Sequence, residues 1–389
     1  MPGHPTWRPE TILQHLGEES KTKGAVVPPL FQNSTFVFDT WDEFTAASTH
    51  QVGGPYHYSR MTNPTCEIAE TKIAALEGTE RCKLFVSGMS AITTAILASV
   101  RAGSHVVCVD ACYGPTKQFV SDYLSKFGVT TTFVVGEDPQ EIFDACRPET
   151  SLIYLESPTS IVFRMQDLEA IGKFAKERGI ATAIDNTYSS PLYQNPAKFG
   201  IDYVLHTGSK YLGGHSDLIA GALCCSEEKI NEIMVHELPV LGHALPPFPA
   251  WLIARSLRTI HLKLRAVCES TAHVANWLSG RPEVDKVFYA GADDHPQKAL
   301  RDKQMSGFPG LVTFRPRRQD ETWLRKMTES TRLFRLGVSW GGHESLIVPL
   351  EFQALDWSSK SWLVRLYCGL ENPLDLTDDL SQAFNLAGE

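Results

Sequence analysis

Short apolar runs alternate with amphipathic segments along the middle of the chain, between about residues 80 and 205. Six of these runs have the length of strands, at residues 84–86, 106–109, 131–135, 152–155, 180–184 and 203–205. Apolar residues recur at helical spacing between several of them, as in the face formed by Phe119, Val120, Tyr123, Leu124 and Phe127. Strands that alternate with helices in this way predict a mainly parallel sheet with helices on both faces. The pattern therefore predicts an α/β fold for this part of the chain.

The N-terminal segment shows a different pattern. Residues 1–60 are rich in proline, glycine, threonine and aromatic residues and show little periodicity. We therefore expect this segment to be an arm that lies across another surface rather than a unit that folds alone. The large domain, residues 61–255, is predicted to open with a helix that Thr65 caps and Gly78 ends.

Beyond Pro249 the regular alternation of strands and helices stops. The predicted elements there are a long helix at 250–278, strands at 310–314 and 362–367, and a closing helix at 374–384. This order predicts a smaller α+β domain at residues 256–389, without a distinct linker in front of it.

Composition narrows the class of protein. The chain has 389 residues, of which 43% are hydrophobic and 21% are charged, as in ordinary globular proteins. Its net charge of -9, without a cluster of lysine and arginine, argues against nucleic acid as a partner. No apolar run approaches the length of a membrane span, and the first residues show no signal-peptide pattern, so we expect no membrane association.

The nine cysteines are scattered and show no zinc-ligand spacing, so no metal site is expected. Free thiols indicate a reducing compartment, and we expect the protein to be cytoplasmic.

One lysine stands in an unusual environment. Lys210 lies in the stretch 207–217 (TGSKYLGGHSD), just after the small hydroxyl residues Thr207 and Ser209 and between two apolar runs. Desolvation there should lower its pKa, which would make it a nucleophile able to form a Schiff base with a carbonyl. An ordinary loop lysine is the alternative.

Three further candidates follow predicted strands. The turn 87–90 (SGMS) stands between a strand and a helix, where N–H groups can bind a phosphate, and Gly88 lets the backbone approach it. Asp185 directly follows the run 180–184, so we expect it at the end of a buried strand. A carboxylate buried there needs a partner such as a pyridinium nitrogen. Tyr113 could stack on a flat ring. An ordinary turn at 87–90 and a structural turn at Asp185 are the alternatives.

The smaller domain contributes two candidates. Arg365 lies inside an apolar strand. The paired N–H groups of its guanidinium suit a carboxylate, either that of a substrate or that of a structural ion pair. The turn 339–342 (SWGG) places the large aromatic Trp340 next to Ser339 and two glycines, as in a pocket wall.

A phosphate turn, a strand-end aspartate, a tyrosine for ring stacking and a desolvated lysine on one sheet edge together favour pyridoxal 5'-phosphate (PLP). Its aldehyde needs an amine, its phosphate needs donors and its ring nitrogen needs a carboxylate.

From about residue 25 to 385 the chain also resembles the PLP-dependent enzymes of cysteine and methionine metabolism. The motifs that carry the resemblance are 58–60 (YSR), 63–65 (NPT), 87–89 (SGM), 183–187 (AIDNT), 209–217 (SKYLGGHSD) and 364–366 (VRL). The resemblance implies an aspartate-aminotransferase-like fold, that of the fold type I PLP enzymes.

The resemblance also implies roles for individual residues. Lys210 would hold PLP as a Schiff base, Asp185 would pair with its ring nitrogen and Tyr113 would stack on the ring. The residues implied to hold the phosphate are Gly88, Met89, Thr207 and Ser209, together with Tyr58 and Arg60 from a neighbouring subunit. The residues implied to bind the substrate are Tyr113, Ser339, Trp340 and Arg365, the last of which would grip the α-carboxylate.

These roles make residues 1–60 an intersubunit arm. The family is typically a homotetramer, a dimer of dimers with the sites at the dimer interface, and its substrates are small amino acids.

The motifs point to more than one branch of the family. Segments 113–116 (YGPT), 156–160 (ESPTS) and 339–342 (SWGG) resemble bacterial cystathionine β-lyases, whereas γ-acting enzymes usually carry asparagine where Ser160 stands. Segment 60–65 (RMTNPT) is closer to the γ-acting branches, and Val338 and His343 differ from the usual β-lyase residues.

We therefore expect a carbon–sulfur lyase that carries out β-elimination of cystathionine, with Lys210 and Tyr113 as its catalytic residues. A γ-lyase or γ-synthase is the alternative enzyme. A cofactor-binding protein without catalysis is the alternative of another class.

Overall fold

The computed structural model describes residues 7–19, 21–48 and 53–388. Its larger sheet consists of β1 (Arg81–Phe85), β2 (His105–Val109), β3 (Thr130–Val134), β4 (Thr150–Glu156), β5 (Ala181–Asp185), β6 (Tyr203–Thr207) and β7 (Gly221–Cys225). The strand order is β1-β7-β6-β5-β4-β2-β3, and β7 runs antiparallel to both of its neighbours. The other adjacent pairs are parallel, so the predicted mainly parallel sheet is confirmed.

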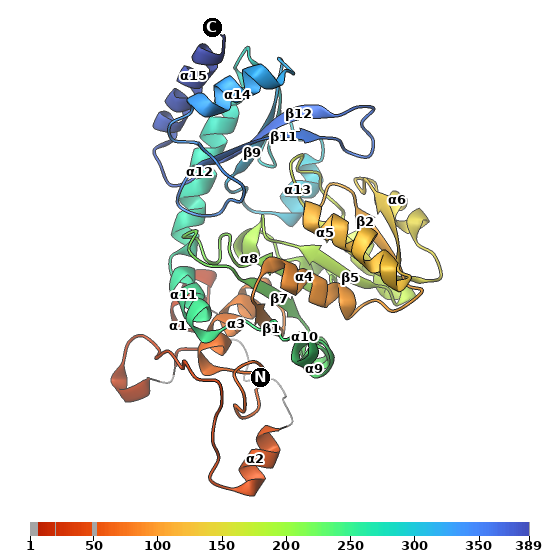
Figure 1. Ribbon diagram of the computed structural model, residues 1–389, viewed down its shortest axis with the longest axis vertical. Coiled ribbons are helices and arrows are strands. Elements are labelled where there is room, and N and C mark those ends of the chain that lie inside the picture. Colours follow the sequence, from red (N-terminus) through yellow and green to blue (C-terminus); the bar gives the residue numbers. More distant parts are fainter. Residues whose placement is uncertain (1–6, 20, 49–52, 389) are drawn as a thin grey trace.

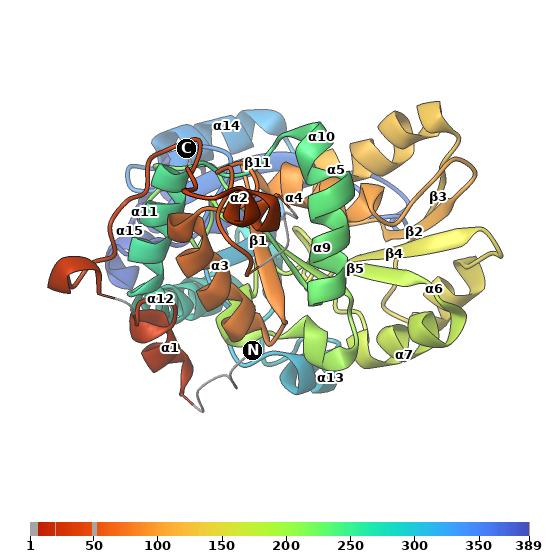
Figure 2. The same ribbon diagram turned by 90° about the horizontal axis from the view of Figure 1, so that it is seen from below.

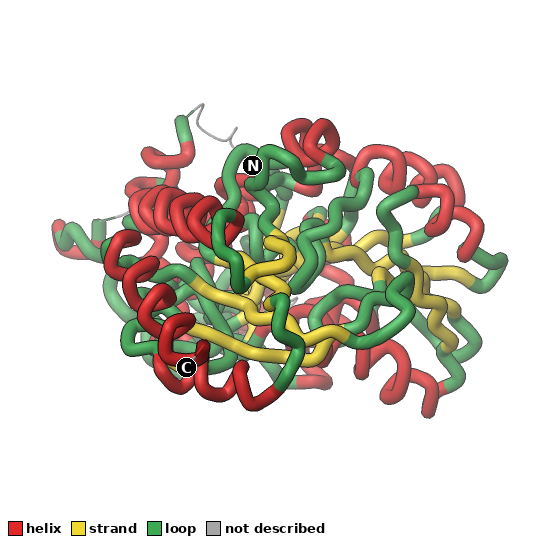
Figure 3. The backbone as a smooth tube through the Cα atoms, turned by 90° about the horizontal axis from the view of Figure 1, so that it is seen from above, coloured by secondary structure: helices red, strands yellow, loops and turns green. Residues whose placement is uncertain are grey.

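Helices cover both faces of this sheet (Figures 1 and 3). α3 (Pro64–Glu77) packs on β1 and β7, α4 (Gly88–Leu97) on β6 and β7, α6 (Pro139–Ala145) on β3, and α7 (Leu168–Arg178) on β5. Strands β2 and β7 are buried along their whole length. Burial on both faces explains why the strands appear in the sequence as continuous apolar runs.

The C-terminal part of the chain forms a second sheet, which lies above the larger one in Figure 1. Its strands are β8 (Val284–Phe288), β9 (Leu311–Pro316), β10 (Arg335–Leu336), β11 (Leu346–Phe352) and β12 (Ser361–Tyr367), in the order β10-β11-β12-β9-β8. Its main helices are α12 (Ile260–Ser279), α14 (Glu321–Ser330) and α15 (Pro373–Gly388). Phe384 of α15 stacks between Trp277 and Trp323, at 5.9 and 6.0 Å between ring centroids, which joins the three helices in one core.

The remaining α-helices are α1 (Pro9–His15), α2 (Trp41–Ala47), α5 (Gly114–Gln118), α8 (Ser190–Tyr193), α9 (Glu227–His236), α10 (Leu238–Leu241), α11 (Pro247–Leu257) and α13 (Lys298–Gln304). Figure 2 shows several of them from below, among them α9, which crosses the view in front of the larger sheet. None of the helices in the described part of the chain combines the length and apolar character needed to cross a membrane.

Two predicted helices differ from the observed ones. The helix predicted at 250–278 is two helices, α11 and α12. At the break between them, the carbonyl of Arg258 accepts a hydrogen bond from Gln14 Nε2 at 2.8 Å. The helix predicted after Pro115 continues beyond α5 as a π turn and a 3₁₀ turn. In that region the carbonyl of Val120 accepts from the Thr131 hydroxyl at 2.8 Å.

The sequence prediction also misplaced a cap and missed a strand. Asn63, rather than Thr65, caps α3, because its Oδ1 accepts from the Thr65 N–H at 2.9 Å while Pro64 takes the first helical position. β7 was not predicted, since a short buried run after several glycines has no periodicity of its own.

The N-terminal segment exposes apolar side chains. Val37 and Trp41 have 91% and 79% of their surface exposed, and Figure 1 shows α2 at the opposite end of the molecule from α15. Part of the predicted arm, residues 1–6, 20 and 49–52, lies outside the described residues. Its packing on a neighbouring subunit stays a prediction.

We expect Gly221→Ala to destabilise the fold. A Cβ at Gly221 would lie 2.1 Å from the carbonyl oxygen of Ser87, so β7 and the start of α4 would have to separate. Overpacking of this kind lowers the free energy of unfolding by about 1–3 kcal/mol, which denaturant unfolding can measure. Gly280→Ala is the matched control, since its Cβ would meet only Trp277 O at 3.7 Å. Equal stability of the two variants would contradict the prediction.

Candidate active site

A cavity of about 470 Å³ lies where the two sheets meet. The predicted site residues that line it are Tyr113, Asp185, Thr207, Lys210, Ser339, Trp340 and Arg365. Asp185 and Thr207 end neighbouring parallel strands, so their side chains reach the same edge of the larger sheet. Arg365 comes from β12 of the smaller sheet. The fold therefore brings seven residues from segments that are distant in sequence around one cavity.

Lys210 lies among groups that disfavour its charge. Burial and, secondarily, the nearby guanidinium of Arg365 lower the pKa of Lys210 to about 8. Its Nζ donates a hydrogen bond to the Ser339 hydroxyl and lies 5.5 Å from the centre of the Trp340 ring. An appreciable fraction of this amine is therefore neutral near neutral pH, as a nucleophile or base requires.

Ser339 links Lys210 to Arg365. Arg365 Nη2 donates to the carbonyl of Ser339 at 3.1 Å, and burial lowers the pKa of Arg365 to about 10. Ser339 adopts a φ of +84°, which is uncommon for a residue with a side chain. This conformation presents its carbonyl to Arg365 and its hydroxyl to Lys210. Such backbone strain is typical of functional sites.

The carboxylate of Asp185 is fixed by hydrogen bonds in a position that suits a cationic partner. Its Oδ1 accepts from the Thr187 N–H at 3.0 Å and from the Thr187 hydroxyl. Burial raises the pKa of Asp185 although these hydrogen bonds oppose the rise. Both hydrogen bonds that Asp185 accepts from described residues go to Oδ1. Oδ2 can therefore accept a hydrogen bond from a group in the cavity. A protonated ring nitrogen of PLP fits this position.

The turn before α4 fits a phosphate. Ser87 Oγ caps the helix by accepting from the Ser90 N–H at 3.0 Å, and the N–H groups of Gly88 and Met89 in the first turn have no intrahelical partner. A Cβ at Gly88 would lie 2.1 Å from Thr207 Oγ1, so only glycine lets this turn approach the end of β6. The donors and the strand end form a cradle for one end of the cofactor.

All six predicted phosphate ligands stay predictions, and three of them make other contacts in this structure. Ser209 Oγ accepts from the Ala220 N–H at 3.0 Å, so its acceptor side is used within the chain. Tyr58 and Arg60 contact each other, with the guanidinium 5.2 Å from the ring centre, but they do not line this cavity. A role for that pair at this cavity requires the arm of another subunit.

Glu156 was not singled out from the sequence, although it stands in a quoted motif. It ends β4 beside Asp185, lines the cavity and accepts from the Tyr113 N–H at 2.7 Å and from Ser160 Oγ at 2.6 Å. Burial, with the charge of Asp185 as a further cause, raises the pKa of Glu156 to about 8. Its place directly after an apolar run was the signal that could have revealed it.

The family model for Cys/Met metabolism PLP-dependent enzymes matches residues 10–385. The chain belongs to this family. It is therefore PLP-dependent, and the residues described above fit that cofactor.

Individual relatives match over nearly their full length. The chain is 35% identical to an L-methionine gamma-lyase of Porphyromonas gingivalis over 95% of both chains. It is 32% identical to a cystathionine gamma-lyase of Bacillus subtilis over 96% of this chain and 98% of the relative.

A solved structure settles the fold. The crystal structure of metB from Corynebacterium glutamicum aligns with a TM-score of 0.89 at 31% identity, covering 98% of each chain. The predicted family and fold type I architecture are confirmed.

We predict that Glu156→Gln changes the pH dependence of stability. Folded Glu156 keeps its proton up to about pH 8, whereas the unfolded side chain loses it near 4.5. The folded state therefore binds more protons between these values, so wild-type stability falls as pH rises through them, by about 1.4 kcal/mol per pH unit for one proton. The glutamine variant should lack this loss.

The measurement is denaturant unfolding of the cofactor-free chain between pH 5.5 and 8. The stability of the variant relative to the wild type should increase with pH. Parallel curves for the two proteins would show that Glu156 does not retain a proton in the folded state.

Proposed function

We propose that this protein is a carbon–sulfur lyase that acts on a sulfur amino acid such as cystathionine by β-elimination. With one water molecule, cystathionine would yield homocysteine, pyruvate and ammonia. The observation that carries the proposal is the convergence of Lys210, Asp185 and Arg365 on one cavity.

Arg365 is proposed to bind the α-carboxylate of the substrate. Its described hydrogen bond goes to a neutral carbonyl, and no carboxylate among the described residues forms an ion pair with it. A buried guanidinium in this state suits a carboxylate that arrives with the substrate. Binding there would place the α-carbon near Lys210.

Lys210 is proposed to be the base that removes the proton from Cα. Its lowered pKa of about 8 suits proton transfer near neutral pH. When bound, PLP supplies an electron sink for the charge left on Cα. Asp185 would keep the ring nitrogen protonated, and Tyr113 would lie on the ring. The thiol would then leave from Cβ.

Two positions on the cavity wall support β-elimination. Ser160 and Trp340 line the cavity and belong to the motifs that resemble bacterial cystathionine β-lyases. Ser160 also donates to Glu156, whose other oxygen binds the N–H of Tyr113. Ser160, one of the two wall residues, is therefore connected through Glu156 to the proposed catalytic residue Tyr113.

γ-Elimination is the second candidate. The relatives reported above are named methionine and cystathionine gamma-lyases, which favours release of 2-oxobutyrate from the same cavity. Lys210, Asp185 and Arg365 would keep their roles, because removal of the Cα proton comes first in both reactions.

We also propose a cytoplasmic homotetramer, a dimer of dimers with its sites at the dimer interface. Exposed Val37 and Trp41 on the arm support a contact with another subunit, which would bring Tyr58 and Arg60 to the neighbouring cofactor. The nine cysteines are all free, as in reducing compartments.

Lys210→Ala should abolish turnover, because the variant lacks the amine that holds PLP and removes the Cα proton. The expected loss is at least about a thousandfold in kcat, measured as keto-acid formation at saturating PLP. Lys263→Ala is a control for loss of a half-buried lysine whose pKa is also lowered by burial. Substantial activity in the Lys210 variant would exclude the proposed role.

The keto acid formed from cystathionine separates the two candidates. Pyruvate together with homocysteine is expected for β-elimination, and 2-oxobutyrate together with cysteine for γ-elimination. Chromatographic identification of both products, extended to cysteine, methionine and acyl-homoserines, gives the answer. A protein that binds PLP but consumes none of these substrates would contradict both reactions.

A further inference from the structure

A buried carboxylate lies behind the cofactor site, on the opposite face of the larger sheet. Glu77 is the last residue of α3 and its side chain is fully buried. Its Oε1 accepts hydrogen bonds from Asn186 Nδ2 at 2.8 Å and from His206 Nε2. The two donors come from different segments, just after β5 and near the end of β6.

The two donors are chain neighbours of proposed cofactor residues. Asn186 directly follows Asp185, and His206 directly precedes Thr207. Successive residues of a strand point to opposite faces of a sheet. Thr207 faces α4, since Gly88 approaches its side chain, whereas His206 faces α3 through Glu77. Glu77 therefore holds the reverse side of the strand ends that present Asp185 and Thr207.

These strand ends need such support. The backbone pairing between β5 and β6 ends at Asp185 and Leu205, followed by one hydrogen bond from the Asn186 N–H to the Leu205 carbonyl at 2.8 Å. On the cavity side, the Thr207 N–H donates to Thr187 Oγ1 at 2.8 Å. Glu77 supplies the corresponding connection on the other side, so both faces of the sheet edge are fixed.

The position of Glu77 is unfavourable for stability. A carboxylate at the C-terminus of a helix meets the negative end of the helix dipole. Its Oε2 is buried without a hydrogen-bond partner in the described part of the chain, and so is Asn186 Oδ1. A buried group that violates local preferences in this way indicates a role other than stabilising the helix.

We propose that Glu77 is a positioning residue for the PLP site, which sets the spacing between Asp185 and Thr207 by binding the residues next to them. The proposal rests on the assignment of these two residues to the cofactor. It does not depend on whether the reaction is β- or γ-elimination.

The test is PLP binding by the cofactor-free protein, followed by absorbance titration. Glu77→Leu should raise the dissociation constant for PLP about tenfold, because it leaves the buried His206 Nε2 without its acceptor and leaves Asn186 Nδ2 only the Gln194 carbonyl. It should also change the visible circular dichroism of bound PLP, which reports how the ring is held. Glu77→Gln, which keeps an acceptor oxygen, should restore binding to within about threefold.

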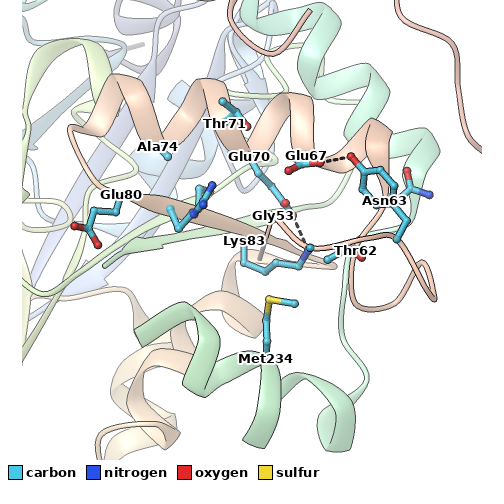
Figure 4. A pocket seen from close by; sticks show the side chains of 14 residues that line it. Gly53, Thr62, Asn63, Glu67, Glu70, Thr71, Ala74, Glu80, Lys83 and Met234 are labelled. Carbon is cyan, nitrogen blue, oxygen red and sulfur yellow. Dashed lines mark hydrogen bonds and ion pairs between the residues drawn. The ribbon is translucent and has the colours of Figure 1, made fainter. Parts of the chain in front are cut away.

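Glu70→Leu is the matched control. Glu70 lies on the same helix, pairs with Lys83 at 3.0 Å and accepts from the Leu84 N–H. Both side chains line the small pocket of Figure 4, which shares no lining residue with the cofactor cavity. Its loss should lower stability but leave the dissociation constant for PLP within about twofold.

Three results would overturn the proposal. One is unchanged PLP binding and dichroism in Glu77→Leu, and another is an equal loss of binding in Glu70→Leu, which would show general destabilisation. If Glu77→Leu does not fold, Asn186→Ala removes one of the two donors and should weaken PLP binding severalfold. Wild-type binding in that variant would be the third.

Discussion

Burial of charge is the constraint on which the rest of this structure depends. One cavity is surrounded by two carboxyl groups, those of Asp185 and Glu156, and two basic groups, those of Lys210 and Arg365. Burial raises the pKa of both acids and lowers the pKa of both bases, so it favours the neutral form of each group. Such groups are costly in a protein interior unless fixed dipoles or partners compensate. The carboxyl edge of the parallel sheet provides compensation, because the ends of neighbouring strands place N–H and hydroxyl groups around the carboxylates.

The second sheet supplies the other part of the electrostatics. Arg365 of β12 and Ser339 reach the cavity from the side of the smaller sheet, and the guanidinium of Arg365 contributes to the lowered pKa of Lys210. The pKa of a lysine beside the larger sheet is therefore set partly by an arginine of the smaller sheet. The relative placement of the two sheets is part of the site, and it also determines where a substrate carboxylate would lie relative to the amine.

Support of the site extends through the sheet. Thr187 connects the strand ends on the cavity side, and Glu77 connects them on the reverse side. Gly88 and Gly221 let α4 approach closely, since any side chain there would collide with Thr207 or with the backbone of Ser87. Residues without contact to the cavity therefore contribute to its geometry.

The sequence by itself determined the α/β fold, the family, the cofactor and seven of the residues that line the cavity. These features leave local signals: apolar runs of strand length, a charged residue directly after a run, and a glycine between a strand and a helix. Elements that depend on distant partners were not predictable. Gln14 binds the carbonyl at the break between α11 and α12, and Thr131 binds a carbonyl in the irregular turns after α5.

Only the tertiary structure revealed Glu156 as a buried neighbour of Asp185 with a raised pKa, the link from Lys210 through Ser339 to Arg365, and Glu77 behind the sheet. Each of these arises from side chains that the fold brings together from separate segments. The physical reason is that pKa values and hydrogen-bond partners depend on burial and on neighbours in space, which the order of residues along the chain does not specify.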